Sequence, residues 1–384
     1  DLKEDGSFKL NMKYFNYATG LTMTNKKFSN LFGQPVRDPK KDLLSDFHMD
    51  IASSIQAVTE EVVLRLTRDI VKEYKIKNLC LAGGVALNCV ANGKILRENN
   101  FEDIWIQPAA GDAGGSLGAA LAYWHRELDK PREDLKDKMK GSYLGPLHEA
   151  SSIEKNLISL KAVYKEKKSS EISSIVAKEL ANSKTVGWFQ GRMEFGPRAL
   201  GARSILADPR SEKMQKELNL KIKFRESFRP FAPSVLREDV YEWFELDNDS
   251  PYMLLVSEVK KNKQIKMKFE DENLFGIEKL NVKRSSIPAI THVDYSARVQ
   301  TVHKETNSRY YDLIKEFKKN TNCPVLVNTS FNVRGEPIVC SVKDAFNCFM
   351  GTNLDILVIE DFILFKDEQD QSLIKDYKNK FELD

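Results

Sequence analysis

The stretch "NLCLAGGVALNCVANGKILRENNFEDIWIQ" (78–107) alternates between short apolar runs and a helical pattern. Its parts predict, in order, a buried strand over 78–82, a helix over 86–98 and a strand over 103–107. The loop "PAAGDAGG" (108–115) then leads into a helix of small residues, "SLGAALAYW" (116–124). Strands that alternate with helices are typical of an α/β domain with a largely parallel sheet.

The flanking regions extend this pattern in both directions. Upstream, residues 47–75 carry apolar side chains at steps of three and four, which predicts a long amphipathic helix. Downstream, the polar stretch 128–150 contains two prolines and two glycines and marks a domain boundary. A second α/β region follows, with helices expected at 170–183, 309–320 and 343–351, strands at 185–189, 231–236, 252–259 and 324–328, and a strand pair over 355–365. Segment 260–286 is expected to be an exposed insertion.

The composition limits the classes of protein and of partner. The chain has 384 residues, enough for two or three domains. Its 59 basic and 56 acidic residues leave a net charge of +3, which argues against a nucleic-acid partner and makes any basic site local. Five cysteines without a C-x-x-C pair favour a reduced, cytoplasmic protein. No apolar run reaches the roughly 18 residues of a membrane span, so we expect no membrane partner.

A glycine-rich turn, "LAGGVALN" (81–88), is the first candidate ligand site. Gly83 and Gly84 stand where a strand meets a helix, so backbone N–H groups can approach a ligand closely. Asn88 is placed to contact a ribose or a base edge. An ordinary strand–helix turn is the structural alternative, and the motif by itself does not exclude it.

A second candidate is the loop that precedes the small-residue helix. Asp112 stands among Gly114, Gly115 and other small residues at a helix start, where an aspartate can hold a metal that is bound to phosphate. Simple helix capping is the alternative. The same stretch contains a literal G-x-S-x-G, the pattern of a serine-hydrolase elbow. Ser116 lies nine positions beyond Gln107 and inside the expected helix, which argues against an elbow.

Arginine-rich segments form the third candidate. "GWFQGRMEFGPRALGARSILADPR" (187–210) and "KIKFRE" (221–226) lie in a region with eleven basic and five acidic residues, 192–237. A solvated basic face is the usual explanation of such a run. Here glycine, proline and phenylalanine separate the charges, which favours a partly dry anion pocket, because arginine binds phosphate or carboxylate in bidentate geometry. The candidate residues are Arg192, Arg198, Lys223 and Arg225.

Two further segments add polar candidates. In "VLVNTSFNVRGEPIV" (325–339) an apolar strand is followed by Ser330 and Asn332, neutral groups that suit an amide or a phosphoryl oxygen. A polar loop that caps its own backbone is the alternative. The segment "THVDYSARVQTV" (291–302) contributes Arg298.

Taken together, these blocks resemble the NodU/CmcH family of O-carbamoyltransferases, in the family's order and over most of the chain. The resemblance implies an α/β protein with two modules. Residues 1–145 would be the C-terminal half of an actin/Hsp70-like (Kae1-like) ATPase domain, and residues 168–384 a YrdC-like domain. The YrdC-like module would join carbamoyl phosphate and ATP into carbamoyl-adenylate. The Kae1-like module would transfer the carbamoyl group to a hydroxyl of a small-molecule acceptor, such as a natural product or a sugar.

The resemblance also implies residue roles. The catalytic residues would be Lys223, Arg225, Arg192 and Ser330, and the substrate and nucleotide contacts would be Gly83, Gly84, Asn88, Gly114, Gly115, Arg198, Arg298 and Asn332. Asp112 would be a metal ligand, with ATP and Mg²⁺ serving adenylate formation and iron (Fe²⁺) serving a complete Kae1-like domain. The family's other metal ligands include an H-x-x-x-H pair that this sequence does not contain. We therefore expect that the first part of the Kae1-like domain is absent and that metal binding is weak.

Two alternative functions stay open. A tRNA threonylcarbamoyl-modifying enzyme has both module types, although the sequence offers no dense basic surface outside the expected pocket. A nucleotide-binding module without catalysis is the other alternative. A homodimer is compatible with the sequence. The sequence does not identify the acceptor molecule.

Overall fold

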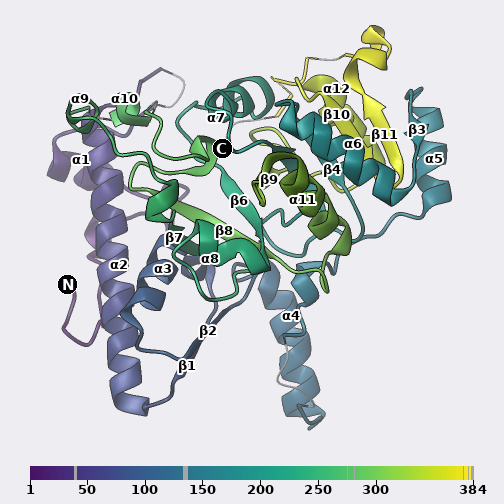
Figure 1. Cartoon of the computed structure of the whole chain (residues 1–384). Coiled ribbons are helices and arrows are strands. Elements are labelled where there is room, and N and C mark those ends of the chain that lie inside the picture. Colours follow the sequence, from purple (N-terminus) through teal and green to yellow (C-terminus); the bar gives the residue numbers. More distant parts are fainter. Residues whose placement is uncertain are drawn as a thin grey trace. The chain divides into compact units, whose positions relative to one another are not determined.

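The computed structural model describes residues 1–38, 41–132, 137–274, 276–280, 282–374, 376–378 and 380–381 (Figure 1). The chain divides into two compact units. Unit 1 comprises residues 1–79 and 90–105, and unit 2 comprises residues 80–89 and 106–384. The boundaries expected from the sequence, at 145 and 168, stay a prediction. No helix in the described residues is both long and apolar enough to cross a membrane.

Helix α2 (Asp46–Tyr74) is the main element of unit 1, and it confirms the long helix predicted from the sequence. Ser45 and His48 form a capping box at its start, and Lys75 ends it in the left-handed conformation with φ 56°. The unit also contains α1 (Lys26–Phe32) and most of α3 (Cys89–Glu98).

The predicted order of strand, helix, strand and helix over 78–124 is confirmed. Strands β1 (Asn78–Leu81) and β2 (Asp103–Ile106) flank α3, and α4 (Ala113–Ala122) follows β2. A single 3-10 turn, Gly84–Leu87, connects β1 to α3. Within the described residues, β1 and β2 pair in a sheet of two strands.

Unit 2 is built around a sheet of nine strands in the described residues, in the order β3-β11-β10-β4-β5-β9-β6-β8-β7 (Figure 1). The strands are β3 (Lys165–Glu166), β4 (Val186–Phe189), β5 (Arg203–Ala207), β6 (Ala232–Leu236), β7 (Leu255–Glu258), β8 (Ser296–Val302), β9 (Val325–Ser330), β10 (Ile356–Ile359) and β11 (Phe362–Phe365). Nearly every residue of β4, β5, β6 and β9 is buried, so these strands form the core.

The described part of unit 2 also contains the helices α5 (Ala150–Ser159), α6 (Ser169–Ala181), α7 (Met214–Glu217), α8 (Val240–Trp243), α9 (Phe269–Glu272), α10 (Gly276–Leu280), α11 (Ser308–Thr321) and α12 (Val342–Gly351), and a π-helical turn, Leu218–Ile222, continues α7. Helix α11 packs against α6 and contacts β6 and β9, whereas α12 contacts α5, β4 and β10.

The large sheet of unit 2 is mixed, which is compatible with the α/β class expected from the sequence. The largely parallel sheet expected from the alternation over 78–124 stays a prediction. Among the described pairings, β10 with β4 and β6 with β8 are parallel, and the others of the large sheet are antiparallel. The physical reason is the connections. No helix separates β4 from β5 or β10 from β11, so the chain can return beside the same strand in the antiparallel direction.

Three strands of the large sheet lie outside the segments where the sequence predicts strands. They are the short β3, β5, which lies in the expected arginine loop, and β8, which carries Arg298. The expected insertion is also less exposed than predicted at its end, because Arg284 and Ser285 are buried. Residues 275 and 281 of this insertion lie outside the described residues.

A buried polar network ties three strands to the loop before β5. The amide nitrogen of Asn328 on β9 donates to Ser234 Oγ on β6 (3.0 Å), Gln300 Oε1 on β8 (2.9 Å) and the Ala199 carbonyl (3.2 Å). Gln300 in turn donates to the Leu200 carbonyl at 2.8 Å. Because buried polar groups are costly without partners, this network fixes residues 199–200 against the sheet.

Candidate functional site

Lys223, Ser330 and Asn332 lie together, as the family resemblance implies. The Lys223 ammonium contacts four oxygens: the Ser330 carbonyl at 2.7 Å, Ser330 Oγ at 3.1 Å, the Asn332 carbonyl at 2.8 Å and Asn332 Oδ1 at 2.6 Å. Ser330 Oγ donates to Asn332 Oδ1 at 2.7 Å. The lysine therefore holds the turn that leaves the carboxyl end of β9.

The charge of Lys223 is not balanced by a carboxylate in this contact. The side chain is buried, and burial together with the positive charge of Arg225 lowers the pKa of Lys223 to about 7. A lysine with such a pKa changes its charge near neutral pH. An anion that entered here would restore the ammonium form, since an opposite charge favours the charged state.

Arg225 follows Lys223 in the loop between the π-helical turn and β6. Its Nε donates to Asn219 Oδ1 at 2.7 Å, and its guanidinium lies 5.1 Å from the centre of the Phe231 ring. Burial and the positive charge of Arg229 lower the pKa of Arg225 to about 10, and Arg298 and Arg334 act in the same direction. Several cations are thus held close together in a partly dry place.

Arg198 and Arg298 extend this basic cluster. Burial and the charge of Arg198 lower the pKa of Arg298 to about 10, whereas the nearby Cys89 side chain acts in the opposite direction. Arg198 donates to the Leu87 carbonyl at 3.4 Å, whereas its Nε is buried without a partner in the described residues. A buried N–H group without a partner is rare, and an anion would satisfy it.

The other arginines of the loop have different roles. Arg203 is fully buried, 3.5 Å from the centre of the Phe189 ring, and donates to the carbonyls of Gln190, Gly191 and Ala202. Arg210 pairs with Asp208 at 2.6 Å. Our interpretation of the whole stretch as an anion-binding loop was therefore too broad, because these two side chains support the fold.

Arg192 also lies apart from the basic cluster. It is exposed and donates to the Gly145 carbonyl at 3.1 Å. With Gln190, Arg309 and Glu360 it lines a cavity of about 270 Å³ that contains neither Lys223 nor Ser330. Its catalytic role stays a prediction that its position in this structure does not support.

Glu194 is a functional candidate that sequence reasoning missed. Its buried Oε1 accepts hydrogen bonds from the backbone N–H groups of Leu200 (2.6 Å), Ala202 (2.8 Å) and Arg203 (3.3 Å). Burial raises the pKa of this carboxyl. A single acid within a run of arginines was the available signal. The carboxylate shapes the loop from which Arg198 projects.

Glu336 and Tyr377 were also missed. The Tyr377 hydroxyl donates to Glu336 Oε1, and Glu336 Oε2 accepts from the Val333 N–H at 2.9 Å. The Glu336 carbonyl accepts from the Asn332 side-chain amide at 2.6 Å. A segment near the end of the chain thereby supports the turn of Ser330 and Asn332, a connection that no sequence pattern indicates.

The glycine-rich turn lies next to the basic cluster. Gly83 has φ +97°, a conformation that favours glycine, and neither Gly83 nor Gly84 has another atom within 4 Å of where a Cβ would stand. The Gly83 N–H donates to the Ala110 carbonyl at 2.9 Å. Asn88 ends the 3-10 turn that carries Leu87, the partner of Arg198. This open turn leaves room for a ligand beside Arg198.

The loop before α4 shows a different pattern. A Cβ on Gly114 would lie 2.2 Å from the Ala109 carbonyl oxygen, so glycine is required there by close backbone packing, whereas Gly115 has open space. Ser116 lies inside α4 and donates to the Ala113 carbonyl at 2.9 Å, which is incompatible with a hydrolase elbow.

Asp112 does not have the surroundings of a metal ligand. It is exposed at the start of α4 and makes no capping hydrogen bond. No group of three His, Cys, Asp or Glu side chains in the described residues could hold a metal ion. One carboxylate does not provide the several protein ligands that an iron centre requires. These residues therefore do not fit the expected iron site.

Comparisons with known proteins agree with the sequence motifs. A family model described as "Carbamoyltransferase N-terminus" matches residues 1–121, and one described as "Carbamoyltransferase C-terminus" matches residues 177–366. The chain belongs to the NodU/CmcH carbamoyltransferase family. The second match contains the whole basic cluster from Arg198 to Asn332.

Relatives of this carbamoyltransferase-family chain include nodulation proteins. It is 45% identical over 324 residues to Nodulation protein NolO of Bradyrhizobium diazoefficiens, a match over 83% of this chain and 55% of the relative. It is 33% identical over 259 residues to Nodulation protein U of Sinorhizobium fredii, a match over 67% of this chain and 40% of the relative. An uncharacterized protein of Synechocystis is 60% identical over all of this chain and 63% of its own length. The chain thus spans 63% or less of these relatives.

Proposed function

We propose that the protein is an O-carbamoyltransferase that uses ATP and carbamoyl phosphate to form carbamoyl-adenylate and then transfers the carbamoyl group to a hydroxyl of a small molecule. The observation that carries this proposal is the cluster of Lys223, Arg225, Arg198 and Arg298 beside Ser330 and Asn332. These four cations form no ion pair within the described residues and lie next to neutral donors and acceptors, which suits a reaction among phosphates and an amide.

The proposed chemistry begins with carbamoyl phosphate. Water releases phosphate from it and leaves carbamate, whose carboxylate oxygen attacks the α-phosphorus of ATP. The bond from this phosphorus to the bridging oxygen breaks, and pyrophosphate leaves with that electron pair. Negative charge grows on the phosphoryl oxygens during the attack, and arginines that are already in place stabilise it. Each hydrogen bond to a charged group contributes about 1.5–3 kcal/mol, not additively.

Lys223, Ser330 and Asn332 would hold the carbamate by its NH₂ group and by the oxygen that does not attack ATP. Lys223 fixes Ser330 and Asn332 through four oxygen contacts, so these side chains are held in one geometry before a ligand arrives. A hydroxyl and an amide can hydrogen-bond the carbamoyl NH₂ and oxygen. Mg²⁺ would accompany the phosphates of ATP. We derive no step through iron, because the described residues do not fit an iron centre.

The test is pyrophosphate release by the chain with ATP, Mg²⁺ and carbamoyl phosphate, with carbamoyl-adenylate identified by mass spectrometry. Lys223→Ala should lower the rate by about a hundredfold or more, as expected when preorganised donors are lost. Lys221→Ala is the matched control, because Lys221 is exposed and pairs with Glu217 at 3.0 Å. A folded wild-type chain that releases no carbamoyl-phosphate-dependent pyrophosphate would contradict the proposal.

The same assay separates the alternatives. A threonylcarbamoyl-type enzyme would release pyrophosphate with threonine and bicarbonate in place of carbamoyl phosphate. A nucleotide-binding module would bind ATP but would release no pyrophosphate, either with carbamoyl phosphate or with threonine and bicarbonate. No feature of the described residues favours either alternative over carbamoyl transfer.

A further inference from the structure

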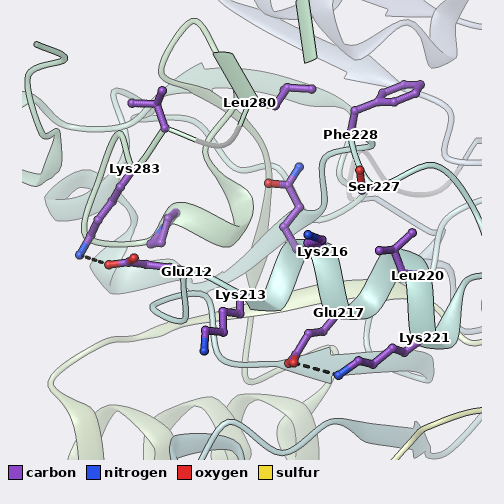
Figure 2. Close-up of a pocket in the computed structure, with 13 residues that line it drawn as sticks. Glu212, Lys213, Lys216, Glu217, Leu220, Lys221, Ser227, Phe228, Leu280 and Lys283 are labelled. Carbon is purple, nitrogen blue, oxygen red and sulfur yellow. Dashed lines mark hydrogen bonds and ion pairs between the residues drawn. The ribbon is translucent and has the colours of Figure 1, made fainter. Parts of the chain in front are cut away.

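A second pocket in unit 2 has no part in the proposed reaction. It has a volume of about 410 Å³ and is lined by residues from the segment 212–221, by Ser227 and Phe228, and by Leu280, Val282, Lys283 and Pro288 (Figure 2). None of Lys223, Arg225, Arg298 or Ser330 lines it. Its volume is in the range of pockets that hold small organic ligands, roughly 300–1,000 Å³.

The charges around this pocket are unbalanced. Four lysines and two glutamates line it. Both glutamates are already paired, Glu212 with Lys283 at 2.8 Å and Glu217 with Lys221 at 3.0 Å (Figure 2). Lys213 and Lys216 have no ion pair with any residue that the structure describes. The pocket therefore has an excess of two positive charges, which favours an anion.

Apolar side chains lie on two sides of the pocket. Figure 2 shows Phe228 and Leu280 on the opposite side of the pocket from Leu220 and Lys216. Leu220 exposes 47% of its surface, so it offers apolar area that a ligand in this pocket can cover. Inorganic phosphate would match the lysines but not these side chains. A ligand with an apolar body and an acidic group would match both.

The pocket shares structure with the basic cluster. Asn219 donates to the carbonyls of Ser227 (3.1 Å) and Arg229 (2.9 Å) and accepts from Arg225 Nε at 2.7 Å. Ser227 and Phe228 line the pocket, whereas Arg225 belongs to the cluster. One loop thus forms a wall of the pocket and carries a proposed catalytic side chain.

We propose that this pocket binds a small organic anion that has an apolar body and one acidic group, at a site separate from the adenylation site. Lys213 and Lys216 attract the acidic group, and Leu220, Phe228 and Leu280 contact the apolar body. Binding does not depend on the proposed carbamoyl chemistry, so either proposal can fail without the other.

The experiment uses two probes on the full chain: the anion anilinonaphthalene sulfonate and its neutral counterpart phenylnaphthylamine, both followed by fluorescence. The double variant Lys213→Glu/Lys216→Glu reverses the two charges. Its affinity for the anionic probe should fall by about tenfold, and added salt should reduce the difference from wild type, because surface charges are screened. Affinity for the neutral probe should change by less than about twofold, because it lacks the charge.

The control variant Lys304→Glu/Lys343→Glu makes the same change in net charge at two exposed lysines that do not line the pocket. It should bind both probes like wild type. Probe that binds elsewhere on the chain is the same in all three proteins and cancels in the comparison. Equal loss of the anionic probe in both double variants, or no loss in the pocket variant, overturns the proposal. Circular dichroism of each variant confirms that the comparison is between folded proteins.

Discussion

Lys223 links the proposed site to pH. Its pKa of about 7 reflects burial and the charge of Arg225. An anion binds the ammonium form, so binding above pH 7 requires the uptake of a proton. We therefore expect the affinity for sulfate, whose own charge does not change in this range, to be constant below about pH 7 and to fall by about tenfold for each pH unit above it, until the pKa of the complex is reached.

Titration calorimetry in buffers of different ionisation enthalpy measures both the affinity and the proton uptake. Lys223→Arg is the informative variant, because a guanidinium stays charged across this range. Its sulfate affinity, even if weaker, should not change in this pH range. A wild-type profile that is flat up to about pH 9 would show that Lys223 does not titrate as proposed.

Tyr377 tests the support of the turn that carries Asn332. Tyr377→Phe removes the hydroxyl that donates to the buried Glu336 carboxylate and leaves the ring in place. Because a hydrogen bond to a charged group contributes about 1.5–3 kcal/mol, the free energy of unfolding in urea should fall by that amount. If the turn also loosens, the KM for carbamoyl phosphate should rise more than kcat falls.

Tyr241→Phe is the matched control for this deletion. Its hydroxyl contacts Glu242 at 3.3 Å, and the side chain exposes 55% of its surface. We expect its free energy of unfolding to stay within about 0.5 kcal/mol of wild type. Equal effects of the two substitutions would remove Tyr377 from the support of the site.

The loop between β4 and β5 depends on one buried carboxylate. Glu194→Ala would leave the N–H groups of Leu200, Ala202 and Arg203 without their acceptor inside the protein. Since each buried polar group that loses its partner costs about 1–3 kcal/mol, urea unfolding should show a loss of at least about 3 kcal/mol. Glu194→Gln keeps an acceptor oxygen and should lose less. A loss in Glu194→Ala no larger than in Glu305→Ala, at an exposed glutamate, would contradict this role.

At the level of elements, the sequence predicted the helices, strands and turns that are determined by local apolar periodicity and turn residues. Helix α2, strand β9 and the turn after it have clear apolar periods and turn residues. The contact of Lys223 with Ser330 and Asn332 was implied by the family resemblance and not by a local pattern. Strand β5 was hidden because Arg203, a charged residue, lies inside the core on an aromatic ring. Glu194 and Tyr377 act across the fold, where chain topology rather than local sequence decides the partner. Their roles could not be inferred from composition or spacing.

At the level of the molecule, the residues that we assign to adenylate formation all lie in unit 2. Asp112 lies in the same unit but without further metal ligands in the described part of the chain. We expect pyrophosphate release to need Mg²⁺ with ATP and to be unaffected by an iron-specific chelator. Iron should bind the purified chain weakly and below one equivalent, as measured by atomic absorption after dialysis. Stoichiometric iron that resists dialysis would require a set of ligands other than the one described here.

The position of β10 has a consequence for how the protein is made. This strand pairs with β4, although Thr185 and Asp355, which hydrogen-bond beside the pair, are 170 positions apart. During synthesis, β4, β5, β6, β8 and β9 all leave the ribosome before β10. Until β10 is made, the edge of β4 that pairs with it stays unpaired and apolar. Unpaired edges of this kind promote aggregation. A nascent chain that ends before β10 would therefore be a substrate for chaperones or proteases, even though every residue of its basic cluster had already been translated.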